Sequence, residues 1–302
     1  MEKNRFPILH DFIEKTKSPI ERELLNVLPS SPQSPLAIGR AMRYSVMSGG
    51  KRLRPLLLVL AHRACGGKGN TVFRVACSIE LVHTFSLIHD DLPSMDDDDM
   101  RRGKPTCHKA FGEGIAVLAG DALLALAFEN LASISNSRAI SSETAVRLIA
   151  ELAGATGAHE MMGGQAADLL HEGKKVSLPR VRRIHEQKTG ALIRASLRMG
   201  GILAGASERM LARLSGYGER IGLAFQITDD ILNLQSTPEK LGKAVQNDLE
   251  RKKPTYPSVI GIGRSCEAVR RLTDEAKKDA KHFGKFRGHF EEMAEFVASR
   301  GN

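Results

Sequence analysis

Two long apolar segments that each carry a pair of aspartates place the strongest constraint on how this chain folds. Residues 75–89 (VACSIELVHTFSLIH) and 221–234 (IGLAFQITDDILNL) are hydrophobic around almost the whole circumference of a helix. A helix of that kind belongs in the middle of a bundle. Yet Asp90 and Asp91 close the first segment, and another aspartate pair lies inside the second. The chain must therefore bring acidic side chains close to a hydrophobic core.

The remainder of the chain also indicates helices. Helical spacing or helix-rich composition runs through most of it, and alternating strand-like runs bounded by turn pairs are missing. The breaks between the helical segments are too short to be linkers between domains. We therefore expect an all-α fold in one domain that spans residues 1–302. The expected helices cover residues 55–64, 71–91, 114–134, 143–162, 179–204, 207–234 and 264–282.

The charge balance narrows the range of partners. The chain has 44 Lys and Arg against 35 Asp and Glu, a net charge of +9, which favours anionic partners. Aromatic residues make up only 5% and Trp is missing, so stacking platforms for nucleic-acid bases are not expected. The basic residues are also scattered rather than gathered in a tail. Phosphorylated small molecules are the favoured partners, and no nucleic acid is expected.

The cysteines and the N-terminus suggest a compartment. Cys65, Cys77, Cys107 and Cys266 lack the spacing of metal ligands, and we expect reduced thiols. The N-terminal sequence has no apolar run before its charges, so no signal peptide is expected. The apolar stretches look shorter than the roughly 18 residues that a membrane span needs. These features predict a cytoplasmic protein without a membrane span.

The aspartates of the first cluster need a cationic partner. The C-terminal end of a helix carries partial negative charge, which disfavours carboxylates there, and clustered carboxylates raise one another's pKa. Four more aspartates follow at positions 96–99. Mg²⁺ suits such a cluster because it takes oxygen ligands from carboxylates and substrate phosphates. For Asp97 to Asp99 alone, a solvated acidic loop is the favoured interpretation.

The second cluster has a regular spacing. Gln226, Asp229, Asp230 and Asn233 follow an i, i+3, i+4, i+7 pattern, which places them on one face of a helix. A polar stripe on an otherwise apolar helix is expected where the helix lines a cavity. The alternative is a buried network of hydrogen bonds between helices.

Basic residues recur beside the acidic clusters. Lys51, Arg52 and Arg54 lie in GGKRLRP (49–55), where a glycine turn precedes a helix. Backbone N–H groups and guanidinium groups in such a turn can bind phosphate. Basic residues also follow both acidic clusters directly, at Arg101, Arg102 and Lys104 and at residues 243–253. The alternative, surface salt bridges, weakens each time the pattern recurs.

Seven motifs in order resemble the trans-isoprenyl diphosphate synthase family, over roughly residues 37–261. Within the family, the motifs resemble those of bacterial farnesyl diphosphate synthases. The second motif of the family usually reads DDxxD, and here Asn233 replaces the last aspartate, which keeps an acceptor oxygen and removes a charge. The motifs are GGKRLRP (49–55), HDDLPSMDDDDMRRGKPTCH (89–108), LAGDAL (118–123), GGQAADL (163–169), QKTG (187–190), FQITDDILN (225–233) and GKAVQNDLERKKPTYP (242–257).

The resemblance implies a fold and a reaction. The fold is a helical bundle of the isoprenoid synthase type around a central active-site cavity, in a homodimer. The reaction condenses isopentenyl diphosphate with dimethylallyl or geranyl diphosphate, gives farnesyl diphosphate and releases diphosphate, with three Mg²⁺ ions in each active site. Three alternatives remain: a geranylgeranyl diphosphate synthase, a low-activity partner subunit of a heteromeric synthase, and a terpene cyclase.

The resemblance also implies residue roles. Asp90, Asp96 and Asp229 would hold the magnesium ions, assisted by Asp91 and Asp230. The allylic diphosphate would contact Arg101, Lys188, Lys243 and Lys253. Isopentenyl diphosphate would contact Lys51, Arg54, His83 and Arg102. The reacting carbons would lie against Lys188, Thr189 and Gln226, whereas Gln165 and Asp168 are weaker site candidates.

In this family the product tail grows beside the helix that precedes the first aspartate motif. Phe85 lies five residues before Asp90 and Ser86 lies four before it. At 1.5 Å per residue, Phe85 is about 7.5 Å along the helix from Asp90. A bulky ring there is expected to stop the product at fifteen carbons, whereas Ser86 is too small to block it.

Overall fold

The computed structural model describes residues 5–30, 36–136, 140–235 and 253–299. Lys243 lies outside these ranges. Helices account for nearly all of the described chain, which confirms the predicted all-α fold. The helices are α1 (Pro7–Val27), α2 (Leu36–Val46), α3 (Leu53–Ala64), α4 (Thr71–Asp90), α5 (Cys107–Phe111), α6 (Glu113–Asn136), α7 (Ser142–Thr156), α8 (Met161–Leu170), α9 (Leu178–His185), α10 (Ala191–Leu203), α11 (Glu208–Gln235), α14 (Tyr256–Ile260), α15 (Ile262–Ala280) and α16 (Arg287–Ala298).

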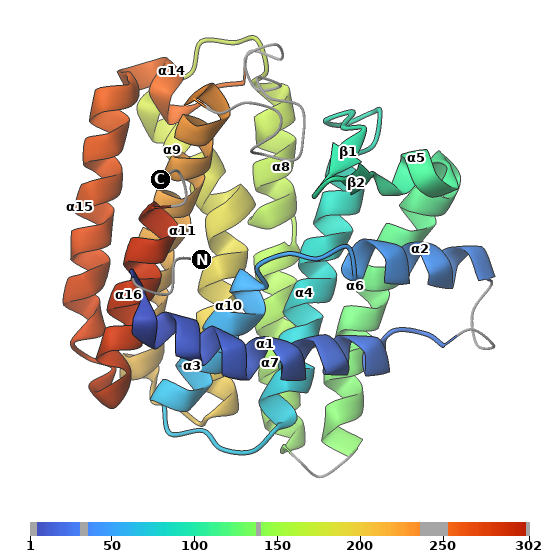
Figure 1. The fold of residues 1–302 in the computed structure, drawn as a ribbon, viewed down its shortest axis with the longest axis vertical. Coiled ribbons are helices and arrows are strands. Elements are labelled where there is room, and N and C mark those ends of the chain that lie inside the picture. Colours follow the sequence, from blue (N-terminus) through green and yellow to red (C-terminus); the bar gives the residue numbers. More distant parts are fainter. Residues whose placement is uncertain (1–4, 31–35, 137–139, 236–252, 300–302) are drawn as a thin grey trace.

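Helix α4 is the central helix that its apolar sequence predicts. Its side chains are buried on all sides, against α1, α3 and α6. The helix ends at Asp90, and Asp91 caps it. The aspartate pair therefore lies at the C-terminal end of a buried helix. In Figure 1 the long helices stand side by side, and α1 crosses in front of them near the bottom.

Helix α11 is the second central helix. It packs against α10 on one side and α15 on the other, and α10 in turn packs against α3 and α7. The apolar stretch of α11 includes Leu223, Ala224 and Ile227, all almost fully buried. Since the aspartate pair lies within this stretch, the carboxylates are held in place by the packing of the same helix.

The helix bounds differ from the predicted ones at several points. The expected helix 143–162 is broken into α7 and α8, because Gly157 caps α7 in an extended conformation. The expected helix 179–204 contains a π-helical turn (Glu186–Gly190) between α9 and α10. Helices α1, α2, α5, α14 and α16 were not predicted. Strands β1 (Met100–Arg101) and β2 (Lys104–Pro105) form a small antiparallel pair that was also not predicted.

Two helices are long and apolar enough to cross a membrane, judged by length and composition alone. They are α4 and α6. From the sequence, every apolar stretch was expected to be too short for this. The most hydrophobic window of α4 is 67% buried inside the protein, as expected of a core helix, whereas that of α6 is only 39% buried. Helix α6 therefore presents a large apolar face to the outside of the chain.

The contact between α3 and α10 depends on Gly200. A Cβ atom there would lie 2.2 Å from the carbonyl oxygen of Leu58 and 2.9 Å from the backbone nitrogen of His62. We predict that Gly200→Ala lowers the free energy of unfolding by about 2 kcal/mol, because backbone atoms cannot move aside as a side chain can. Gly154→Ala on α7 is the control, since a Cβ there meets nothing within 4 Å. Urea denaturation measures the free energy of unfolding of the two variants. If Gly200→Ala were as stable as Gly154→Ala, the close packing of α3 against α10 would be contradicted.

Candidate active site

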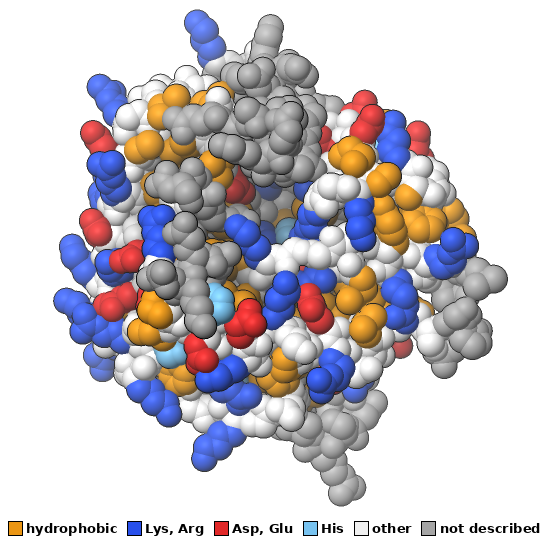
Figure 2. Space-filling model, in the orientation of Figure 1, with side chains coloured by type: hydrophobic (Ala, Val, Ile, Leu, Met, Phe, Trp, Pro, Cys, Tyr) orange, Lys and Arg blue, Asp and Glu red, His pale blue; other side chains and the backbone are white. Residues whose placement is uncertain are grey.

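A cavity of about 680 Å³ opens between the ends of the central helices. Helix α4 and the loop after it supply one wall, α11 supplies the opposite wall, and α8 and the π-helical turn lie between them. Figure 2 shows a hollow in this face of the molecule, with Lys and Arg side chains at its edge. Both predicted aspartate clusters therefore face one space.

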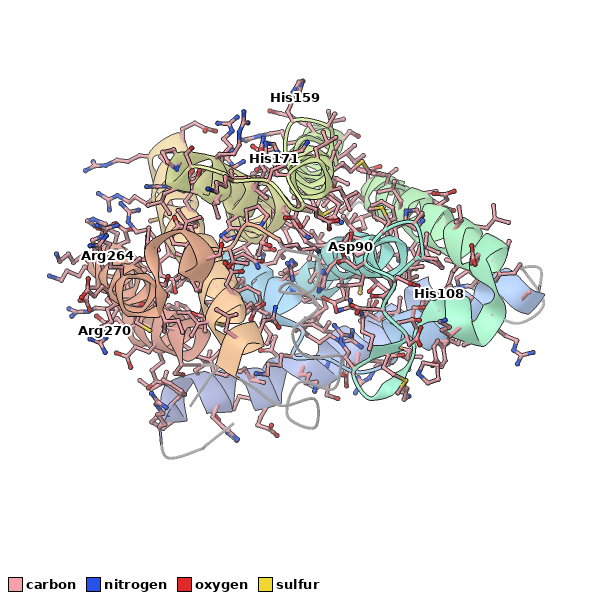
Figure 3. All side chains as sticks on the ribbon, turned by 90° about the horizontal axis from the view of Figure 1, so that it is seen from above. Asp90, His108, His159, His171, Arg264 and Arg270 are labelled. Carbon is pink, nitrogen blue, oxygen red and sulfur yellow. The ribbon has the colours of Figure 1, made fainter. Side chains whose placement is uncertain are left out.

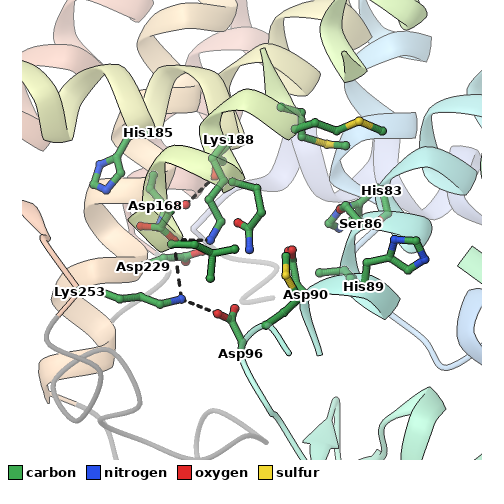
Figure 4. A pocket seen from close by; sticks show the side chains of 18 of the residues that line it. His83, Ser86, His89, Asp90, Asp96, Asp168, His185, Lys188, Asp229 and Lys253 are labelled. Carbon is green, nitrogen blue, oxygen red and sulfur yellow. Dashed lines mark hydrogen bonds and ion pairs between the residues drawn. The ribbon is translucent and has the colours of Figure 1, made fainter. Parts of the chain in front are cut away.

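The loop after α4 folds back on the end of the helix. The backbone N–H of Asp96 donates a hydrogen bond of 2.7 Å to the carbonyl oxygen of Asp90. This turn places both side chains on the same wall of the cavity, as Figure 4 shows. Asp229 lines the opposite wall from α11. The three aspartates predicted to hold metal ions thus surround the same cavity.

Two lysines lie among these carboxylates. Lys188 Nζ donates to Asp168 Oδ2 at 2.7 Å, and Lys253 Nζ donates to Asp96 Oδ1 at 2.6 Å. Lys253 Nζ is also 3.7 Å from Asp168 Oδ2. Because the Lys253 side chain is only 8% exposed, these ion pairs are largely shielded from solvent. They link α8, the π-helical turn, the first aspartate motif and the segment before α14.

Burial and neighbouring charges shift the pKa values of this cluster in opposite directions. Burial raises the pKa of Asp90 to about 6, although nearby Lys188 opposes the shift. Burial alone would lower the pKa of Lys188, but the carboxylates of Asp168, Asp90 and Asp96 outweigh it and raise the pKa. In the same way, the two lysines outweigh burial at Asp96 and Asp168 and lower the pKa of both. Of Asp90, Asp96 and Asp168, only Asp90 has its pKa raised, because burial there outweighs the nearby lysine.

The π-helical turn fits between two glycines. A Cβ atom on Gly164 of α8 would lie 2.3 Å from the backbone nitrogen of Lys188. On the other side, a Cβ atom on Gly222 of α11 would lie 2.8 Å from the Cα atom of Gly190. Close approach on both sides holds the extra residue of the turn in place. The turn in this way aims Lys188 and Thr189 into the cavity.

A chain of hydrogen bonds crosses from the π-helical turn to α11. The Thr189 hydroxyl donates to Gln226 Oε1 at 2.6 Å, and Gln226 Nε2 donates to Asp230 Oδ1 at 3.1 Å. The other oxygen of Asp230 accepts from the backbone N–H of Tyr256 at 3.0 Å and lies 3.5 Å from His185 Nε2. The polar stripe on α11 thus lines the cavity and also forms an interhelical network, so both interpretations of it hold.

Asp91 pairs with Arg101 and does not line the main cavity. Its carboxylate accepts hydrogen bonds of 2.7 and 2.8 Å from Nε of Arg101 and lines a separate small crevice. Since Asp91 is only 2% exposed, its place in the structure is beside Arg101 rather than in the main cavity. Arg101 reaches the main cavity from the other side. Asp91 is therefore placed to orient Arg101.

The basic residues of the glycine-rich motif 49–55 lie in three different surroundings, and Arg102 shares one of them. Arg54 and Arg102 line the cavity near His83, whose pKa burial and the neighbouring Arg54 lower well below the ordinary value. Arg52 is buried against Glu80, with 2.7 Å between its Nη1 and Oε1 of that residue. Lys51 lies over the ring of Phe296 at 5.3 Å and does not line the cavity.

The structure gathers most of the predicted site residues and adds some that the sequence did not indicate. His185 and several apolar residues of the cavity were missed, because an isolated His or Met on a helix does not stand out from core residues. Predicted residues that line the cavity are Arg54, His83, Phe85, Ser86, Asp90, Asp96, Arg101, Arg102, Gln165, Asp168, Lys188, Thr189, Gln226, Asp229, Asp230 and Lys253. Unpredicted ones include His89, Leu124, Met161, Met162 and His185.

A separate group of possible metal ligands lies outside the cavity. Asp97, Asp99 and His108 bring one ligand atom each to within 4.8 Å of one another. The two aspartates are exposed, and Lys109 Nζ lies 2.8 Å from Asp99 Oδ1. Figure 3 shows His108 to one side of Asp90, on α5. Asp97 and Asp99 therefore fit the predicted solvated acidic loop, whereas the prediction is wrong for Asp98, which is 5% exposed and whose Oδ2 lies 3.3 Å from Nη2 of Arg101.

The cavity combines charged and apolar walls. Carboxylates, lysines and arginines line it together with the apolar side chains of Phe85, Leu124 and Met161, and Phe85 and Met161 are almost fully buried. A ligand that fits has an anionic head and a hydrophobic tail. The fold and the site therefore define an all-helical enzyme that acts on diphosphates of apolar chains.

Comparison with known proteins gives the family. The family model described as "Polyprenyl synthetase" matches residues 36–293. The chain belongs to this family, and it is a trans-prenyl diphosphate synthase.

Individual relatives differ in the product that their names state. A chloroplastic geranylgeranyl pyrophosphate synthase 12 of Arabidopsis thaliana is 46% identical over 275 residues, which are 90% of this chain and 76% of the relative. A farnesyl diphosphate synthase of Geobacillus stearothermophilus is 40% identical over 292 residues, 97% of this chain and 98% of the relative. The crystal structure of a geranyltransferase from Helicobacter pylori, complexed with magnesium and isoprenyl diphosphate, matches with a TM-score of 0.82 at 32% identity, over 95% of this chain and 96% of that one.

Proposed function

We propose that this protein is a farnesyl diphosphate synthase that extends dimethylallyl and geranyl diphosphate with isopentenyl diphosphate. The single observation that carries the product is the position of Phe85, which lines the cavity five residues before Asp90 on α4. Its side chain is almost fully buried, so it has little room to move aside. A growing tail meets this ring within the cavity.

The residues of the cavity suit magnesium. Asp90, Asp96 and Asp229 offer carboxylate oxygens from two walls, and Mg²⁺ prefers oxygen ligands shared with substrate phosphates. The ammonium group of Lys253 already neutralises Asp96, which indicates that this carboxylate needs a cation. We propose three ions in each site with diphosphate bound. When bound, magnesium supplies positive charge that stabilises the departing diphosphate.

The cationic side chains bind the two diphosphates on different sides of the cavity. Arg101, Lys188 and Lys253 face the aspartates and are placed to hold the allylic diphosphate; we assign Lys243 to the same group from the motif alone. Arg54, His83 and Arg102 lie together on the α3 and α4 side and are placed to hold isopentenyl diphosphate. Lys51 does not line the cavity, and we assign it to the same group from the motif alone. Two separate anion sites favour a synthase over a terpene cyclase, which needs only one.

The reaction needs no nucleophile from the protein. The allylic C–O bond breaks and its electron pair leaves with diphosphate, which gives an allylic cation. The double bond of isopentenyl diphosphate attacks that cation, the new C–C bond forms, and the proton lost from the adjacent carbon goes to the released diphosphate. Fixed positive charges stabilise the charge that develops on the leaving group. Thr189 Oγ1 and Gln226 Oε1 present oxygen dipoles toward the cation, and apolar walls exclude water.

The metal sites can be tested by removing one charge from each wall. We predict that Asp90→Asn and Asp229→Asn each lower turnover at least 100-fold while the fold remains, because Asn keeps the shape and loses the charge that holds the cation. Diphosphate release measures turnover, and circular dichroism checks the fold. Asp99→Asn is a matched control outside the cavity, expected to keep normal turnover. Near-normal turnover in both cavity variants would contradict the assignment.

The product length can be tested at Phe85. We predict that Phe85→Ala shifts the main product from fifteen to twenty or more carbons, because removing the ring opens space that a longer tail fills. Chromatography of the dephosphorylated products from geranyl diphosphate gives the chain length. The competing assignment is a geranylgeranyl diphosphate synthase, which makes twenty carbons already in the wild type. An unchanged distribution in the variant would show that Phe85 does not limit the chain.

We also propose that two copies of the chain pair through α6. Val117 and Leu118 of this helix are 39% and 50% exposed, and an apolar face of this kind is normally covered. Two-fold pairing of identical faces is the commonest way to close such a contact.

The dimer can be tested by placing a charge on the exposed face of α6. We predict a dimer mass for the wild type and a monomer mass for Leu118→Glu in light scattering at micromolar concentration, because burying one charge from each copy disfavours the contact. Val259→Glu on α14, a distant and similarly exposed position, should leave the dimer intact. A monomeric wild type would contradict the proposal.

A further inference from the structure

The ring of Phe85 does not stand alone in the wall of the cavity. It packs edge-to-face against the ring of His89, with 4.8 Å between ring centroids and an interplanar angle of 73°. The two residues are four apart on α4, so their side chains lie on the same face of that helix. Both line the cavity. Figure 4 shows His89 beside Ser86, to one side of Asp90.

His89 is itself held against α6. Its Nε2 lies 3.2 Å from the carbonyl oxygen of Val117, and a carbonyl can only accept, so Nε2 carries the proton of this hydrogen bond. A Cβ atom on Gly120 would lie 2.2 Å from Nε2 and 2.5 Å from Cδ2 of the ring. The imidazole therefore occupies space that only a glycine leaves open. It connects the last turn of α4 to the first half of α6.

We propose that His89, seated on Gly120, is a positioning residue that fixes the Phe85 ring and so determines the longest prenyl chain that the cavity accepts. This inference rests on the proposed function and adds a residue that supports the Phe85 ring from the side. An edge-to-face pair stabilises two rings beyond the area that they bury. The energy of the pair is similar in size to the overpacking that opposes one more isoprene unit against a rigid ring. Losing the support therefore changes the product.

Substitutions at the two positions act in opposite directions. In His89→Ala the ring of Phe85 loses its support and can swing toward α6, which lengthens the cavity. In Gly120→Ala the new methyl group pushes the imidazole away from α6 and toward Phe85, which shortens the cavity. His89→Phe keeps a ring against Phe85 and loses the hydrogen bond to the Val117 carbonyl and the 3.8 Å contact of Nε2 with Oδ1 of Asp121. Gly114→Ala is a matched control on the same helix, because a Cβ there meets nothing within 4 Å.

The experiment measures product length and binding on each variant. His89→Ala should raise the ratio of twenty-carbon to fifteen-carbon product about tenfold, and Gly120→Ala should raise the share of ten-carbon product. His89→Phe and Gly114→Ala should keep the wild-type distribution. Calorimetry should show that, in His89→Ala, the affinity for geranylgeranyl diphosphate relative to that for farnesyl diphosphate rises about tenfold. A general loss of folding would not change this ratio of affinities in that direction.

The two readouts separate this inference from the proposed function. If the wild type releases no diphosphate from allylic substrates, the proposed function fails, and the binding ratio still decides the role of His89. Product and binding ratios that stay at wild-type values in both His89→Ala and Gly120→Ala would overturn the inference. A ratio in His89→Phe equal to that in His89→Ala would also overturn it, because the ring contact would then have no effect.

Discussion

The active-site half of this structure depends on one buried set of ion pairs. Lys188 and Lys253 hold carboxylates from the first aspartate motif and from α8 in a largely shielded position. Charges in such a place are costly unless they are paired, and removing one partner leaves the other uncompensated. The lysines therefore keep the acidic groups assembled, and the same acidic groups keep both lysines in the cavity. A bound cation and a bound diphosphate can exchange with these partners without creating an unpaired charge.

The geometry behind these pairs comes from close backbone packing. Gly164 and Gly222 let α8 and α11 approach the π-helical turn from both sides, so the turn has one fixed position. Lys188 and Thr189 point into the cavity because of that position. A glycine has the same effect beside Phe85, because Gly120 leaves the space in which the His89 ring packs. Glycines in these helices therefore determine both where the charges lie and where the ring beside Phe85 lies.

The sequence predicted the parts of the structure that have a local signature. The burial of α4 and α11 follows from their apolar circumference, and the polar stripe at Gln226, Asp229, Asp230 and Asn233 follows from helical spacing. The order of the motifs predicted which of these residues share a cavity. The amphipathic helices α1, α2 and α16 were missed because they mix apolar and polar residues and lack the long apolar runs of the central helices.

Long-range packing accounts for what the sequence did not predict. No local pattern shows that Asp91 pairs with Arg101 instead of facing the cavity, or that Lys51 lies over Phe296. The π-helical turn needs the two glycines on other helices, and the break between α7 and α8 depends on how Gly157 ends a helix. These features arise only when the helices are brought together. Residues with a lone ring, such as His89 and His185, gain their roles in the same way.

The central claim is that the two aspartate-bearing helices hold divalent cations across one cavity. Crystals grown with Mn²⁺ and inorganic diphosphate test it most directly, because the anomalous signal of manganese locates each ion without reference to the protein. The account predicts manganese beside Asp90 and Asp96 on one wall and beside Asp229 on the other, with Lys253 moved from Asp96 to the diphosphate. Manganese found only at Asp97, Asp99 and His108, with the Lys253–Asp96 pair unchanged, would contradict it.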